Sequence, residues 1–146
     1  MRSDIARYLN ENNMKICIID DDPICHFIAE KMIEKVDSKS ELSHFQNGRE
    51  ALDFFTEQQD NPERLPDLIF VDINMPVLNG WNFLSMLEEL KIKRYDPNIF
   101  ICSSSNNSQD LARAHIMAGV NGYLNKPLNP RMLQNVFQNI ADPIHC

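Results

Sequence analysis

Short apolar runs alternate along the chain with longer segments in which apolar residues recur every three or four positions. The runs at 14–19, 68–71 and 98–102 are almost continuously apolar and rich in the residue types that favour strands. Weaker strand signals cover 41–45, where apolar and polar residues alternate, and 121–125. Helical periodicity fills the intervals, so the pattern predicts five strand–helix units.

Capping residues mark where several of these helices begin. An Asp or Asn before a Pro supplies a side chain acceptor for the first helical turn, and Pro suits the first helical position. An Asn followed three residues later by Glu resembles a capping box. The predicted starts are Asp22–Pro23, Asn47–Glu50 and Asn129–Pro130. We also expect a helix over 108–118, with Gly119 as its C-terminal stop.

The alternation of strands and helices predicts an α/β fold with a doubly wound, mostly parallel sheet and helices on both faces. Strands that are apolar throughout are expected inside such a sheet, because both of their faces are covered. The alternating segment at 41–45 is expected at an edge. Sites in these sheets lie outside the carboxyl ends of the strands, so the residues that follow each strand decide the function.

Composition narrows the class of protein. A chain of 146 residues with 43% hydrophobic and 24% charged residues is typical of one soluble globular domain. The net charge of -7 offers no basic face for nucleic acid, and no apolar run is long enough for a membrane span or a signal peptide. The four cysteines lack CxxC spacing, so we expect neither disulfides nor cysteine-bound zinc. We therefore expect a cytoplasmic protein.

Polar residues with a common chemistry follow four of the predicted strands. Asp20–Asp22 follow the first, Asp72 the third, Ser103–Ser105 the fourth and Lys126 the fifth. Clustered carboxylates repel one another unless a cation neutralises them, and carboxylate oxygens suit Mg²⁺. A carboxylate beside Mg²⁺, a hydroxyl and an ammonium is equipped to attack phosphorus and hold the resulting acyl phosphate. The residues alone thus indicate phosphoryl chemistry.

Four motifs together resemble a known family. The stretches IIDDDP, VDINMPVLNG, the serine-rich end of the fourth strand and GYLNKPL are similar, in order and spacing, to the receiver domain of two-component response regulators. The match covers about 14 to 140. It implies a flavodoxin-like, five-stranded parallel sheet of order 2-1-3-4-5. It also implies Mg²⁺-dependent transfer of a phosphoryl group from a phosphohistidine onto one Asp, in a signalling protein that catalyses only its own phosphorylation and dephosphorylation.

The resemblance assigns the acidic residues. Asp72 matches the phosphoacceptor, and Asp20 and Asp21 match the acidic pair that holds the metal. Asp21 is expected to contact the metal directly and Asp20 through water, with Asp72 also a ligand. Asn74 matches the position whose backbone carbonyl ligates the metal and whose side chain faces the hydrolytic water. Asp22 falls outside the pair and is assigned to helix capping.

The resemblance also assigns the switch residues. Lys126 matches the lysine that contacts the phosphoryl oxygens, and Tyr123 matches the aromatic switch position. Two serines compete for the switch hydroxyl. Ser104 lies 22 residues before Lys126, as in many family members, whereas Ser103 directly follows the last apolar residue of the strand. We favour Ser104, because the segment from Gly119 to Tyr123 keeps the family's ordinary spacing to Lys126.

Domain organisation and partners follow from the same likeness. We expect a receiver domain over 14–146 and an N-terminal extension over 1–13, which either packs as a short helix or forms a separate arm. Without an attached output domain, the signal would pass through the face of the fourth helix, fifth strand and fifth helix, about 108–140, to an unknown downstream protein or a second copy in a homodimer. The phosphoryl donor would be a sensor histidine kinase or a histidine phosphotransfer protein.

Three other functions would each require a different set of residues. A degenerate receiver that serves as a phosphorylation-independent docking module would have lost the acceptor, acidic pair or lysine, yet all are present. It stays open as the second hypothesis. A haloacid dehalogenase-type phosphatase needs a second Asp two residues after the first, where this chain has Asn74. A dinucleotide-binding fold needs clustered glycines after the first strand, and DDDPIC contains none.

Overall fold

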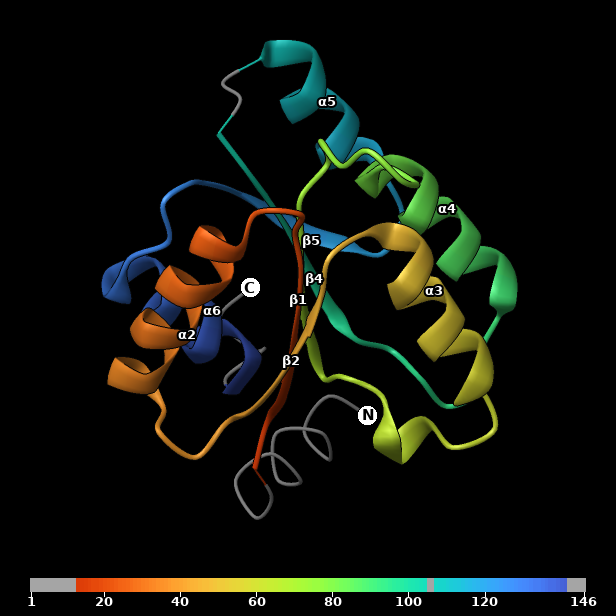
Figure 1. Ribbon diagram of the computed structural model, residues 1–146, viewed down its shortest axis with the longest axis horizontal. Coiled ribbons are helices and arrows are strands. Elements are labelled where there is room, and N and C mark those ends of the chain that lie inside the picture. Colours follow the sequence, from red (N-terminus) through yellow and green to blue (C-terminus); the bar gives the residue numbers. More distant parts are fainter. Residues whose placement is uncertain (1–12, 105–106, 142–146) are drawn as a thin grey trace.

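The computed structural model describes residues 13–104 and 107–141 and contains a parallel sheet with strand order β2-β1-β3-β4-β5 (Figure 1). This confirms the doubly wound, flavodoxin-like order. The strands are β1 (Lys15–Ile19), β2 (Glu41–Phe45), β3 (Leu68–Val71), β4 (Asn98–Ser103) and β5 (Val120–Asn125). The helices are α2 (Pro23–Val36), α3 (Gly48–Glu57), the 3-10 helix η1 (Pro62–Arg64), α4 (Gly80–Leu90), α5 (Ser108–Ile116) and α6 (Pro130–Ala141). Apart from Asn13, the expected extension lies outside the described residues.

Helices cover both faces of the sheet, with α2 and α6 on one face and α3, α4 and α5 on the other (Figure 1). Each face has its own apolar core. The first core includes Ile18, Ile33, Phe70 and Leu133, and the second includes Ile19, Phe55, Val71 and Phe83. Neighbouring residues of one strand, such as Phe70 and Val71, therefore belong to opposite cores. This double burial explains why β1, β3 and β4 are apolar throughout.

The strands predicted to be interior are more buried than the strand predicted to be at an edge. All four residues of β3 are buried, and so are four of the five in β1. The edge strand β2 has no fully buried residue, and each of its positions is either exposed or half-buried. These observations confirm that the solid apolar runs mark interior strands and that the alternating run marks an edge.

The predicted caps are present at three helix starts. The side chain of each capping residue accepts a hydrogen bond from a backbone N–H of the first turn, which would otherwise lack an intrahelical acceptor. The donors are Ile24 for the Asp22 cap, at 2.9 Å, Glu50 for Asn47, at 2.8 Å, and Met132 for Asn129, at 2.9 Å. Local sequence chemistry thus fixes where α2, α3 and α6 begin.

Several element boundaries differ from the prediction by one or two residues. Strand β1 begins at Lys15 rather than at residue 14, and β5 begins at Val120 rather than at residue 121. Helix α5 ends at Ile116 rather than at residue 118, because Met117 has an extended backbone with ψ of 126°, although its N–H still donates to the carbonyls of Arg113 and Ala114. Gly119, with φ of +84°, belongs to the turn that follows rather than to the helix end itself. Strand β4 runs one residue further than expected and includes Ser103.

The pairing of β4 with β5 contains a one-residue irregularity. Ile99 pairs with Val120 but the next residue, Phe100, pairs with Gly122, so Asn121 is extra in β5. The side chain of Asn121 accepts a hydrogen bond from the Ile99 N–H at 2.8 Å and so replaces a ladder bond. Within the described part of the chain, no helix is long and apolar enough to cross a membrane.

Candidate functional site

Three carboxylates meet at the carboxyl edge of the sheet, where the parallel strands end. Asp20 and Asp21 follow β1, and Asp72 follows β3, its neighbour in the sheet. Oxygens of the three carboxylates all lie within 4.8 Å of one another. Asp20 and Asp72 are buried, with 4% and 7% of their surface exposed, whereas Asp21 is exposed. The structure therefore brings the predicted acidic residues together.

The backbone holds these carboxylates in place by extending the sheet beyond the strand ends. The Asp72 N–H donates to the Ile19 carbonyl at 2.9 Å, and the Asp20 N–H donates to the Phe45 carbonyl at 3.0 Å. Gly80, the first residue of α4, permits this arrangement. A Cβ atom at Gly80 would lie 2.4 Å from the Asp72 carbonyl oxygen, so any larger residue would push the loop that begins at Asp72 away from the helix.

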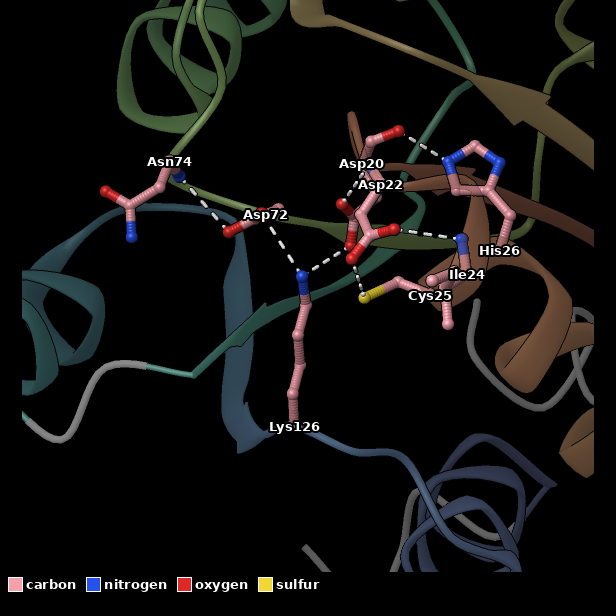
Figure 2. A network of polar contacts seen from close by, with 8 residues as sticks. All are labelled: Asp20, Asp22, Ile24, Cys25, His26, Asp72, Asn74 and Lys126. Carbon is pink, nitrogen blue, oxygen red and sulfur yellow. Dashed lines mark hydrogen bonds and ion pairs between the residues drawn. The ribbon is translucent and has the colours of Figure 1, made fainter.

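Lys126 reaches the acidic cluster from the end of β5 and forms ion pairs with two of its members (Figure 2). Its Nζ lies 2.5 Å from Asp20 Oδ2 and 3.2 Å from Asp72 Oδ2. The Lys126 N–H donates to the Ser103 carbonyl at 2.9 Å, and the Lys126–Pro127 peptide bond is cis. One ammonium thus offsets part of the negative charge of the cluster.

The surroundings of the site shift the pKa values of Asp72 and Lys126. Burial raises the pKa of Asp72 above its ordinary value, although the Asn74 N–H and the Lys126 ammonium oppose this rise. Burial alone would lower the pKa of Lys126, but the hydrogen bond and charge of Asp20, together with the charge of Asp72, outweigh it and raise that pKa. Lys126 is therefore a permanent cation at neutral pH.

The other predicted site residues lie in the loop after Asp72, at the end of β4 and in β5. The Asn74 N–H donates to Asp72 Oδ1 at 3.1 Å, and Figure 2 shows its side chain directed away from that carboxylate. Ser103 ends β4 with its side chain fully buried, while Ser104 is exposed immediately beyond it. Tyr123 is half-buried in β5 and packs against the core beneath α3 and α4.

Sequence reasoning missed two histidines next to this site. A ring nitrogen of His26, Nε2, lies 2.5 Å from the backbone carbonyl oxygen of Asp20 (Figure 2). His44, from β2, stacks on His26. The two are 18 positions apart, and only the pairing of β2 with β1 brings His44 to the α2 side of the sheet, opposite Ile18. No local pattern could have indicated this contact.

Comparison with known proteins agrees with the fold. The family model for the response regulator receiver domain matches residues 16–138. The nitrate/nitrite response regulator protein NarL of Escherichia coli K12 is 30% identical over 132 residues, which is 90% of this chain and 56% of NarL. The chain thus spans about half the length of that relative.

Solved structures give the same result. A two-component response regulator from Cytophaga hutchinsonii is 27% identical, with a TM-score of 0.75 over 90% of this chain and 98% of that one. The receiver domain of Saccharomyces cerevisiae Ssk1, crystallised with the histidine phosphotransfer protein Ypd1, has the same fold at 23% identity and a TM-score of 0.72, over 89% and 90% of the two chains. The chain belongs to the response regulator receiver domain family of two-component signalling.

Proposed function

We propose that this receiver accepts a phosphoryl group on Asp72 from a phosphohistidine donor and then changes a partner-binding surface. The observation that carries this proposal is the central position of β3 in the sheet. It sets Asp72 between the acidic pair that follows β1 and the serine and lysine that follow β4 and β5. A phosphorus atom at Asp72 would therefore meet metal ligands on one side and neutral or cationic hydrogen-bond donors on the other.

The chemical step is a displacement at phosphorus. A carboxylate oxygen of Asp72 forms the new P–O bond, the P–N bond of the phosphohistidine breaks, and its imidazole leaves. The Asn74 N–H holds Asp72 Oδ1 at 3.1 Å and so orients the attacking group. Lys126 contacts Asp72 Oδ2 in the resting state and is placed to move onto a phosphoryl oxygen.

The residues of the cluster fit Mg²⁺, which takes oxygen ligands and only a few protein carboxylates. Asp21, Asp72 and the Asn74 carbonyl would hold the ion, with Asp20 acting through water. When bound, the ion would neutralise developing charge on the transferred group. The Asp20 carboxylate already accepts hydrogen bonds from the Lys126 ammonium and the Asp22 N–H. This supports contact of Asp20 with the ion through water rather than directly.

The switch would use a serine hydroxyl and Tyr123. We retain Ser104 as the hydroxyl that binds a phosphoryl oxygen, because it is exposed beside the site, and keep Ser103 as the alternative. The extra residue at Asn121 supports Ser103, since it lengthens the path from β4 to Lys126 by one position. In either case the loop would move inward and Tyr123 would follow.

The output surface would be the face of α5, β5 and α6. Two large apolar side chains on α5, Leu111 and Ile116, are 42% and 83% exposed. Such side chains are available to a downstream protein or a second copy of the chain. The donor would be a sensor histidine kinase or a phosphotransfer protein, and the complex of Ypd1 with a receiver of the same fold supports the latter.

Labelling with acetyl phosphate and Mg²⁺ tests the proposal. The parent should gain one phosphoryl group by mass spectrometry, Asp72→Asn should gain none, and Asp22→Asn, which keeps a capping acceptor, should behave as the parent. Labelling of Asp72→Asn would show that the acceptor is another residue. An unlabelled parent would overturn the proposal and favour the phosphorylation-independent docking module.

A further inference from the structure

The two imidazoles of His26 and His44 face each other next to the acidic site but outside it. Their Nδ1 atoms are 3.0 Å apart, and the stacked rings have centroids 4.8 Å apart and an interplanar angle of 25°. His26 lies on α2 and His44 on β2, so two different elements position the pair. None of the roles assigned above to the phosphoryl site uses either ring.

The hydrogen bonds of His26 decide which nitrogen is available. Its Nε2 contacts the Asp20 carbonyl oxygen, which can only accept, so Nε2 must carry the hydrogen. In the neutral ring, Nδ1 then has a free lone pair directed toward His44. Histidines that bind metals typically donate their second ring N–H to a carbonyl or carboxylate in this way. His26 therefore has the hydrogen-bond arrangement of a metal ligand.

The separation of the two nitrogens also suits a shared ion. Two nitrogens bound to tetrahedral zinc at about 2.0–2.1 Å each lie about 3.3 Å apart, a few tenths more than the observed Nδ1–Nδ1 distance. His44 is exposed on the edge strand and can make that adjustment without disturbing the core. Although His44 is exposed overall, partial desolvation of its ring and the neighbouring His26 lower its pKa, which favours the neutral form that can bind a metal.

Glu30 lies on the same side and could become a third ligand, although among the described residues only Asp20, Asp21 and Asp72 already have three ligand atoms within 4.8 Å of one another. Glu30 is one helical turn after His26 on α2, so both side chains leave the same face of the helix. The negative charge of Glu30 raises the pKa of His44, although the larger effects of desolvation and of His26 lower it. Glu30 is half-buried. Its long side chain can rotate toward the two imidazoles.

We propose that His26 and His44, completed by Glu30 after rotation of its side chain, bind a borderline divalent transition-metal ion such as Zn²⁺, at a site separate from the carboxylate site that suits Mg²⁺. Imidazole nitrogens select zinc, copper or nickel, whereas an all-oxygen cluster selects magnesium. The Asp20 backbone joins the two sites, since its carbonyl receives the His26 N–H while its side chain contacts Lys126. The zinc site does not depend on phosphorylation.

Zinc titration against a competing chromophoric chelator, in excess Mg²⁺, tests the site. The parent should bind one equivalent, and His44→Ala should bind at least about tenfold more weakly. His115→Ala, which removes an exposed histidine of α5, is the matched control and should retain the parent affinity. Asp21→Asn should also retain it, because that residue belongs to the other site.

Two further measurements keep the test decisive. Co²⁺ should give visible absorption bands in the parent that disappear in His26→Ala and His44→Ala, with folding of each variant checked by circular dichroism. Parent-like zinc affinity in His44→Ala would overturn the proposal, and so would loss of zinc binding in Asp21→Asn alone. A parent that binds no zinc would show that the histidine pair is a hydrogen bond only.

Discussion

The two halves of the carboxyl edge are packed very differently. We call β1, β3, α3 and α4 the packed half, and the end of β4 together with α5 and β5 the exposed half. All four residues of β3 are buried, whereas β5 has no fully buried residue. Helix α4 buries five residues, but α5 buries only Ala114. Asp72 and the acidic pair thus follow well-buried strands, and the expected switch lies beside elements that bury few side chains.

This difference matches the two tasks expected of the site. Phosphoryl transfer requires groups that are held in place before the reaction, which the ladder bonds of Asp20 and Asp72 provide. A switch requires two arrangements that differ by only a few kcal/mol, and sparse packing makes a second arrangement accessible. Lys126 belongs to the exposed half but bonds to carboxylates of the packed half, so it couples the two.

The largest expected effect is on stability. Phe83 on α4 is fully buried, and Phe83→Ala should lower the free energy of unfolding by about 3–5 kcal/mol, because it leaves a cavity in the core. Ile116→Ala removes a side chain of α5 that is 83% exposed and should change that free energy by less than about 0.5 kcal/mol. Urea titration measures both. Equal losses in the two variants would contradict the division into halves.

The next effect concerns metal binding in the packed half. Mg²⁺ at one hundred times its Kd should stabilise the parent by about 2.7 kcal/mol, and Asp21→Ala should lose most of this gain. Asp22→Ala removes only the cap of α2 and should keep it. Removing Asp21 should also relieve repulsion among the carboxylates, so the metal-free variant should be at least as stable as the metal-free parent. Thermal unfolding with and without Mg²⁺ provides the comparison.

Coupling between the halves should be weaker but measurable. Ser104→Ala should still be labelled at Asp72 but should fail to engage its partner. Loss of a charge-assisted hydrogen bond would remove about 1.5–3 kcal/mol from the active state. Ser103→Ala should behave nearly as the parent in a pulldown with and without beryllofluoride and Mg²⁺. The reverse result would move the switch to Ser103, and intact coupling in both variants would exclude the hydroxyl mechanism.

The smallest expected effect comes from removing either of two similar helix N-caps. Asn47 caps α3 and Asn107 caps α5, and each accepts a backbone N–H at 2.8 Å. Asn47→Ala should lower the global free energy of unfolding by about 1 kcal/mol. Asn107→Ala should instead speed amide hydrogen exchange within α5 and leave the global value nearly unchanged. Global destabilisation by both variants would show that α5 unfolds only with the whole domain.

Sequence patterns were sufficient wherever local chemistry decides the structure. The caps at Asp22, Asn47 and Asn129 fixed three helix starts, and continuous apolar runs located the interior strands. The acidic residues and Lys126 could be placed together because parallel strands all end at one edge. These features need only the order of elements and not the detailed pairing.

Features that depend on strand register could not be predicted. The extra residue at Asn121 arises from the pairing of β4 with β5, and the contact of His26 with His44 arises from the pairing of β1 with β2. The periodicity of one strand does not show which residues of the neighbouring strand it pairs with, so an extra residue in the pairing cannot be located from the sequence. The choice between Ser103 and Ser104 depends on the same kind of detail, which is why two spacing rules gave different answers.

The reach of Lys126 has a consequence for how the chain folds. It joins Asp20 across 106 positions of sequence and Asp72 across 54, so neither ion pair can form before β5 has joined the sheet. Contacts of such high sequence separation form late, because a long loop must close first. During synthesis, the N-terminal part of the domain would carry its acidic cluster without this counterion. The domain would then become able to receive a phosphoryl group only after β5 has docked. A partly folded domain would lack the lysine that the reaction needs.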